Sequence, residues 1–168
     1  MIVVQPNADT NVLRQVYGSF PSGVVAIAAR IGGTLVGMAA SSFTSVSMEP
    51  PLVAICIQNT STTWPRVAQA SRIGLSVLSD DHNDICRQLS ARDGDRFEGV
   101  PILETSDGAI FIQGASAHLD CSVHDTFSAG DHQMVLLRVR RVDFSPEREP
   151  LVFHASGFHR IRRSSQAA

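Results

Sequence analysis

The residues with the clearest chemical potential lie between Gly37 and Leu52. This segment reads Gly-Met-Ala-Ala-Ser-Ser-Phe-Thr-Ser-Val-Ser-Met-Glu-Pro-Pro-Leu, so it holds four serines and one threonine but no lysine or arginine. Hydroxyl groups and backbone amides make hydrogen bonds without carrying a charge. The segment therefore suits a ligand that short polar contacts hold along its length, with its flat part against apolar walls.

Histidine and cysteine side chains suggest a metal site, but their spacing argues against one. On a strand over 115–126, His118 and His124 would lie about 20 Å apart and share an exposed polar face with Asp120. Cys121 would point the other way, into the core. We therefore expect no metal. The chain also lacks a Gly-x-Ser-x-Gly elbow, a Gly-Lys-Ser/Thr phosphate loop and a Gly-x-Gly-x-x-Gly motif, although a hydrolytic triad assembled from distant residues stays open.

Length and composition predict one domain over residues 1–168, with a core from about 12 to 160 and short terminal tails. The chain is 43% hydrophobic and 18% charged, which is enough to build a sizeable core. A net charge of −2 and a pI near 6.3 give no reason to expect nucleic acid or a membrane surface as a partner. Three widely spaced cysteines, no signal peptide and no long apolar run predict a cytoplasmic protein with reduced thiols.

The elements that must position the serine-rich segment are mostly strands. Apolar runs and turn residues predict strands over 24–31, 34–40, 42–48, 52–57, 73–78, 109–112, 115–126, 133–144 and 151–153. Short helices are expected from Asn7 or Asp9 to about Gly18, after 59–62 to about Ala70, and from Asp80 or Asp81 to about Ala91. The fold class is therefore mainly β, an antiparallel barrel or sandwich with a few short helices.

The segment over 92–108 is rich in turns and charges. Its apolar residues Phe97, Val100, Ile102 and Leu103 are expected to anchor it to the core. We assign Arg96 no role beyond packing.

Several motifs resemble one known family, in its order along the chain. Residues 20–24 (Phe-Pro-Ser-Gly-Val) resemble its Phe-Pro-x-Gly-Val opening, and residues 37–47 resemble its Gly-x-Thr-Ala-Ser-Ser-Phe-x-Ser-Val-Ser signature, with Ala39 in place of threonine. The further motifs are Pro50-Pro51-Leu52, Asn59-Thr60-Ser61, Asp95–Gly99, Ala129-Gly130-Asp131-His132 and Gly157-Phe158-His159-Arg160. The chain from about Val12 to Arg160 is thus similar to the short-chain flavin reductases.

This resemblance implies an FMN-binding split barrel, usually a homodimer whose flavin sites lie near the subunit interface. The flavin contacts that it implies are Ala39, Ala40, Ser41, Ser42, Phe43, Ser45, Ser47, Asn59, Ser61 and Phe158. Hydroxyl groups would hold the flavin phosphate without a fixed cation. His132 would be the catalytic residue, positioning nicotinamide or flavin beside it, because hydride transfer to a flavin needs no general base.

The implied activity is the reduction of FMN or FAD by NADH or NADPH, after which the reduced flavin diffuses to a separate monooxygenase component. Its partners would be the flavin and nicotinamide nucleotides. Two alternatives stay open. One is a flavin-binding module without reductase activity, and the less favoured one is a flavin-dependent oxidase of the pyridoxamine-phosphate type. That oxidase would need a basic cluster for its substrate, and the central segments contain few lysines or arginines.

Overall fold

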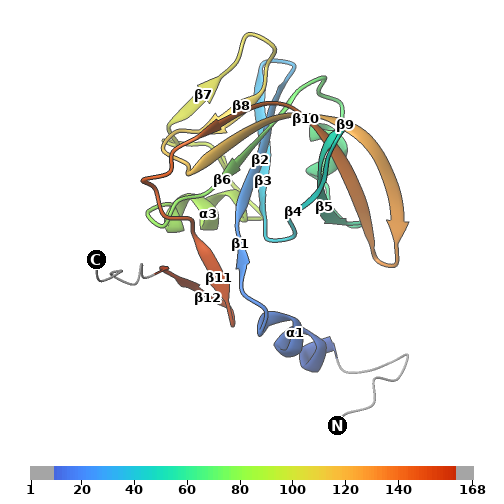
Figure 1. Ribbon diagram of the computed structural model, residues 1–168, viewed down its shortest axis with the longest axis vertical. Coiled ribbons are helices and arrows are strands. Elements are labelled where there is room, and N and C mark those ends of the chain that lie inside the picture. The colour runs from blue at the N-terminus through green and yellow to red at the C-terminus, as the bar shows by residue number, and fades with distance from the viewer. Residues whose placement is uncertain (1–9, 162–168) are drawn as a thin grey trace.

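The computed structural model describes residues 10–161, and strands dominate it (Figure 1). The strands are β1 (Ser22–Gly23), β2 (Val25–Ile31), β3 (Thr34–Ala40), β4 (Thr44–Met48), β5 (Pro51–Gln58), β6 (Ile73–Val77), β7 (Ile102–Glu104), β8 (Ile110–Ile112), β9 (Ala117–Ala129), β10 (His132–Phe144), β11 (Val152–His154) and β12 (Gly157–His159). The helices are α1 (Thr10–Gly18), α2 (Trp64–Val67) and α3 (Asn83–Leu89). None of the helices over 10–161 is long and apolar enough to cross a bilayer.

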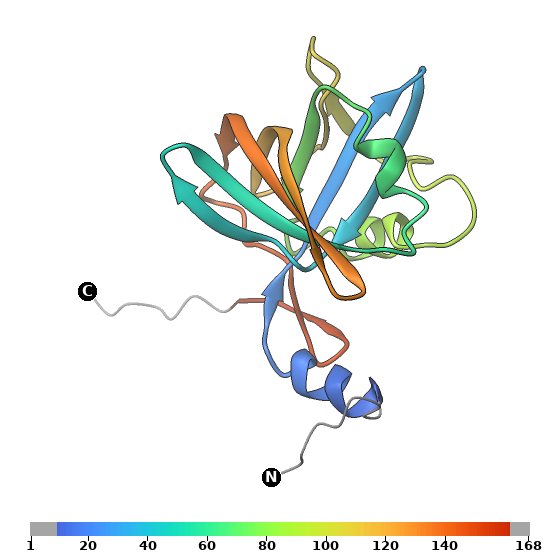
Figure 2. The same cartoon turned by 90° about the vertical axis from the view of Figure 1, so that its right-hand side faces the viewer.

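Seven strands form one curved antiparallel sheet in the order β3-β2-β6-β9-β10-β5-β4 (Figure 2). Its end strands, β3 and β4, are not paired with each other, so the barrel stays open. The chain crosses this opening through Ser41–Phe43. The Ser42 hydroxyl accepts a hydrogen bond from the Cys56 amide and donates one to the Cys56 carbonyl, both at 3.0 Å, which ties the crossing to β5. The predicted antiparallel split barrel is confirmed.

The first five residues of strand β2, Val25 to Ala29, are all apolar because both faces of the strand are buried there. Val25 and Ile27 point into the cluster inside the curved sheet, which α2 covers. Ala26 and Ala28 point into a second cluster on the outer face, which α3 and β8 cover. Successive side chains of a strand point to opposite faces, so a strand between two cores needs apolar residues at every position.

Helix α1 and a small sheet of β1, β11 and β12 extend from one end of this body (Figures 1 and 2). No α1 side chain is buried. Val16 is 59% exposed, Tyr17 70% and Phe20 77%, so the extension carries apolar surface that this chain alone leaves in water.

Most predicted elements are confirmed, but some of their ends differ. The predicted caps Asn7 and Asp9 lie outside the described residues. Helix α3 begins at Asn83 rather than near Asp80 or Asp81, because these two residues serve the preceding turn: the Asp80 amide donates to the Glu149 carbonyl, and the Ser79 hydroxyl donates to the Asp81 carboxylate.

The helix predicted after 59–62 is confirmed as α2, but it spans four residues and ends before Ala70. Strands β1, β7 and β12 were not predicted, because they have only two or three residues each, too few for a periodic pattern. Phe97 is buried as expected, whereas Leu103 is 44% exposed and does not anchor its segment.

The predicted exposed face of β9 is wrong for two residues. His118 is only 8% exposed and Asp120 only 2%, while Cys121 is buried as expected. Strand β8 and the loop after it cover that face: one His118 ring nitrogen lies 2.9 Å from the Ile112 carbonyl oxygen. Alternation along β9 correctly separated its two faces, but it did not reveal that both are covered in the first half of the strand.

Candidate functional site

A groove of about 800 Å³, which we call the central groove, opens beside the split of the barrel. The end of β3, the β5–α2 loop, the segment after α3 and the start of β10 form it. Its volume is in the range of small-molecule sites. Its walls are Met38–Ser42, Cys56–Gln58, Thr60–Thr63, Leu89, Ser90, Arg92, Arg96 and His132.

One wall of the central groove is the end of edge strand β3. Ala39 and Ala40 pair with β2 on one side only, which leaves the outer backbone groups of β3 available to a ligand. Their methyl side chains leave room for a flat group. Ser41 is exposed, whereas the Ser42 hydroxyl is occupied by its two hydrogen bonds to Cys56.

The opposite wall is the hydroxyl-rich loop between β5 and α2. The Ser61 amide donates to the Gln58 carbonyl, and the Ser61 hydroxyl accepts a hydrogen bond from the Trp64 amide at 3.1 Å. These bonds fold the loop so that Thr60, Thr62 and Thr63 also line the groove. The predicted site residue Ser61 is therefore both a lining residue and a support for α2.

Two arginines from the segment after α3 also line the central groove. Arg96 Nη1 donates to the Gly37 carbonyl at 3.1 Å and to Thr63 Oγ1 at 2.8 Å, which fixes the guanidinium between β3 and α2. Within residues 10–161 its Nε and Nη2 have no hydrogen-bond partner, so their donor hydrogens are available to a ligand. Arg92 is exposed beside it. Arg96 therefore has the packing role expected of it, but the groove also contains two guanidiniums that the sequence analysis did not expect there. These guanidiniums weaken the charge argument against the oxidase alternative.

A close backbone approach makes room for the arginine segment. A β-carbon on Gly37 would lie 2.6 Å from the Ile27 carbonyl oxygen and 2.7 Å from the Phe97 ring. Only glycine at this position lets Phe97 pack against β3, and Phe97 follows Arg96 directly in sequence.

His132 lines the central groove from the first position of β10. Its Nδ1 lies 2.7 Å from Asp131 Oδ1, and this hydrogen bond lowers the pKa of the Asp131 carboxyl. An ionised carboxylate only accepts hydrogen bonds, so Nδ1 carries the proton. The ring is thereby oriented by its neighbour in the two-residue turn.

Asn59, a predicted site residue, does not line the central groove. Its amide nitrogen donates to the Asp131 carbonyl at 2.9 Å, and its side chain donates to the Gly130 carbonyl at 3.2 Å. Asn59 therefore holds the β9–β10 turn that carries His132.

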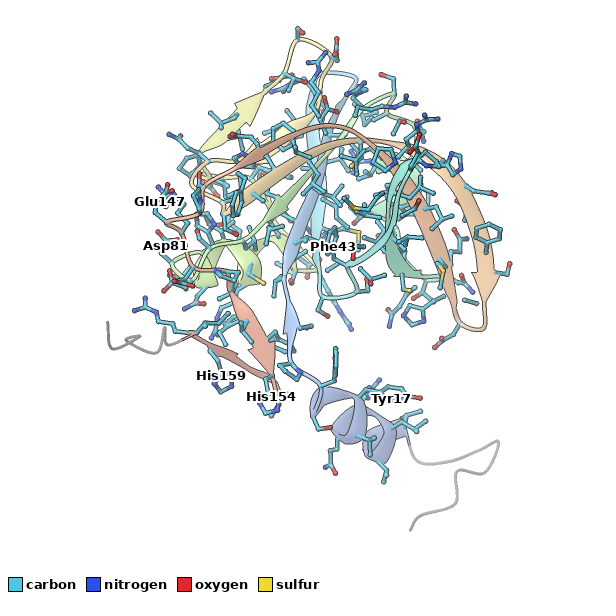
Figure 3. The ribbon with its side chains drawn as sticks, viewed as in Figure 1. Tyr17, Phe43, Asp81, Glu147, His154 and His159 are labelled. Carbon is cyan, nitrogen blue, oxygen red and sulfur yellow. The ribbon has the colours of Figure 1, made fainter. Side chains whose placement is uncertain are left out.

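The remaining predicted residues lie elsewhere. Phe43 packs against the inner core cluster, within the body of the molecule (Figure 3). Ser45 and Ser47 lie on β4 and do not line the central groove. Phe158 lines a second groove of about 410 Å³, which adjoins the central one at Ala39–Ser41, and its ring contacts Phe153 and the Arg87 guanidinium.

Sequence reasoning missed the arginines and three threonines of the central groove. Thr60 and Thr62 were interpreted as turn and capping residues only. Arg92 and Arg96 lie more than 50 residues after the β3 residues that they face. The Asp-Arg-Phe-Glu-Gly motif was the one sequence feature that could have identified Arg96. It supported the family resemblance, but it did not show that this segment lies beside β3.

Among residues 10–161, no group of three or more histidine, cysteine, aspartate or glutamate side chains is arranged to hold a metal ion. The polar groups of the central groove are hydroxyls, amides, two guanidiniums and one imidazole. This donor set fits an organic anion with a long polar chain.

The family model described as flavin reductase like domain matches residues 17–162. The chain belongs to this family. A flavin reductase from Pseudomonas putida is 36% identical over 157 residues, which cover 93% of this chain and 92% of that protein. The reductase subunit of a flavin-dependent monooxygenase from Rhodococcus jostii is 34% identical over 146 residues, which cover 87% of this chain and 75% of that subunit.

A solved structure of a related enzyme is similar in fold to this chain. The NADH:FAD oxidoreductase of Streptomyces globisporus, in complex with NAD and FAD fragments, superposes with a TM-score of 0.89 at 34% identity and covers 100% of both chains.

The central groove of this flavin reductase-like chain fits a flavin nucleotide. Its volume is large enough for a nucleotide, and it combines a small-residue wall at Ala39 and Ala40, a hydroxyl-rich loop and two guanidiniums. The second groove meets it at the small-residue wall. A third groove of about 560 Å³ meets it at Thr62, Thr63, Arg92 and Arg96. The two ends of the central groove therefore differ in chemistry.

Proposed function

We propose that this chain is an NAD(P)H:flavin oxidoreductase that reduces FMN or FAD and supplies the reduced flavin to a separate monooxygenase. The central groove carries this proposal, because an edge strand with small side chains and a guanidinium pair lie within one nucleotide-sized space. The relatives support it: one is named a flavin reductase and another a monooxygenase reductase subunit.

A bound flavin would supply the hydride-accepting chemistry, and the residues of the central groove would hold and orient it. The backbone of Ala39 and Ala40 binds the ring edge and stabilises negative charge there. Arg92 and Arg96 bind the phosphate, and Arg96 is held ready for this by Gly37 and Thr63. His132, fixed by Asp131, positions the reactants and transfers no proton. The Phe158 side of the second groove gives NAD(P)H a separate approach to the ring end.

The test is the consumption of NADH or NADPH by flavin-free protein, followed by its absorbance with and without added FMN or FAD. Oxidation that rises and saturates with added flavin supports the reductase. Flavin binding without consumption of either nucleotide assigns the non-catalytic binding module instead, and the absence of flavin binding refutes the proposal.

We further propose that two copies of this chain form a homodimer. The apolar surface of α1 supports this, as do Val46, 50% exposed, and Met48, 93% exposed, on edge strand β4. Sedimentation velocity is expected to give a dimer, and Met48→Lys is expected to weaken it by placing a charge in the contact. A monomer at all concentrations refutes the assignment.

We propose a single domain that acts in the cytoplasm. The three cysteines are free thiols, and Cys86 and Cys121 are buried, which suits a reducing compartment. Cell fractionation tests this, and recovery with secreted proteins would contradict it.

A further inference from the structure

The third groove carries chemistry that a flavin ring and one phosphate do not use. It continues from the central groove past Arg92 and Arg96 and adds walls from β3, α2 and the segment before Phe97. We propose that this third groove binds the adenosine diphosphate half of FAD, and that Arg66 selects FAD over FMN. This inference rests on the proposed function.

The charge of the third groove supports a second phosphate. Arg66 lines this groove but not the central one, whereas Arg92 lines both. Both side chains are exposed, and neither forms an ion pair with any other residue in the described part of the chain. The one acidic residue in the wall, Asp95, accepts a hydrogen bond from the Phe97 amide at 2.8 Å. In the wall of the third groove, guanidinium groups therefore outnumber carboxylates.

The position of Arg66 makes it selective. FMN ends at one phosphate, which Arg92 and Arg96 can bind at the end of the central groove. FAD continues through a second phosphate and an adenosine, and the third groove of about 560 Å³ lies on that continuation. Arg66 is thus placed to contact the part that only FAD has.

NAD(P)H also contains an adenosine diphosphate half, but the arrangement of the grooves favours FAD. A nicotinamide nucleotide with its adenosine in the third groove would have to pass along the central groove to reach the ring end. The flavin already occupies that path. The second groove, which meets the central one at Ala39–Ser41, offers a route that does not overlap.

The experiment titrates flavin-free protein with FAD and with FMN by fluorescence. We expect FAD to bind about tenfold more tightly than FMN, and Arg66→Ala to remove that difference, the size of one charged hydrogen bond. FMN affinity should stay unchanged, which also shows that the variant is folded. Arg66→Lys should retain part of the preference. Arg140→Ala removes an exposed arginine of β10 that lines none of the three grooves, and it should change neither affinity.

Three results would overturn the inference. Wild-type protein could bind FAD and FMN equally, or Arg66→Ala could weaken both alike. Arg66→Ala could instead leave the FAD affinity unchanged and raise the KM for NADH in assays with FMN as the flavin. That result would show that the third groove binds the nicotinamide nucleotide. Each of these results would refute the role of Arg66 without refuting the proposed reductase activity. If neither flavin binds, the proposed reductase function itself is refuted.

Discussion

Two ion pairs of this chain share one geometry and differ in burial, which makes their energies predictable. Arg72 Nε lies 2.8 Å from Asp120 Oδ1, and its Nη2 lies beside the other carboxylate oxygen. Arg30 contacts Glu104 in the same paired manner, at 2.8 Å for both bonds. The Asp120 side chain is 2% exposed, whereas that of Glu104 is 38% exposed.

Replacement of Asp120 by alanine is expected to lower the free energy of unfolding by about 3 kcal/mol. Breaking one partner of a buried pair costs ~3–5 kcal/mol, because the other charge stays buried without compensation. Arg72 retains 19% exposure of its side chain, so water partly solvates it and the lower end of that range applies. Glu104→Ala leaves Arg30 in solvent, so we expect a change close to the experimental error.

Urea unfolding, followed by circular dichroism, measures both variants and the wild type. The double variant with Arg72→Met and Asp120→Leu should recover most of the stability lost in Asp120→Ala, since no charge is then buried. Equal losses for Asp120→Ala and Glu104→Ala would refute the reasoning, because burial would then not decide the energy of these pairs.

Three further predictions concern the site and the thiols. Arg96→Ala removes the hydrogen bonds to Gly37 and Thr63. The flavin affinity should then fall at least about tenfold in a titration, and the free energy of unfolding should fall by about 1–2 kcal/mol. Arg96→Lys should retain part of the affinity and part of the stability. Burial lowers the pKa of His82 from 6.5, so the unfolded chain binds the extra proton first; stability should fall as the pH drops below about 6.5, and His82→Gln should reduce that slope. Burial raises the pKa of Cys121 to about 12, so iodoacetamide should not modify this thiol. Cys56, in the wall of the central groove, should be modified first, and more slowly when FAD is present. Peptide mass spectrometry measures both modifications.

Much of the fold was predictable because the strands are long and their turns have specific chemistry. Strand β3 has the predicted bounds because Gly32 and Gly33, with φ of 55° and 83°, fix the hairpin before it. The failures have one cause. The exposure of His118, Asp120 and Leu103 depends on β7 and β8. Strand β7 is too short to leave a pattern, and the predicted strand that became β8 gave no sign of which face it covers.

The site was predictable where it is one continuous segment. Ala39–Ser42 lines the central groove as expected, because a strand and its crossing keep their residues together. Ser45 and Ser47 do not, because β4 turns away along β5 after the crossing. The arginines come from a segment whose position depends on Phe97 packing against Gly37, a contact between residues 60 apart that no local pattern predicts.

The open barrel explains why binding residues gather where they do. A closed barrel would pair the backbone groups of every strand, whereas this one leaves β3 and β4 as edges that something else must satisfy. In the crossing between them, the Ser42 hydroxyl is the side-chain group that ties the chain to β5. In our proposals the β3 edge serves the flavin ring and the β4 edge, with Met48, serves a second copy. The two proposals then share one cause: a sheet that stops one pairing short of closure provides both a ligand site and an interface, close together and linked by three residues.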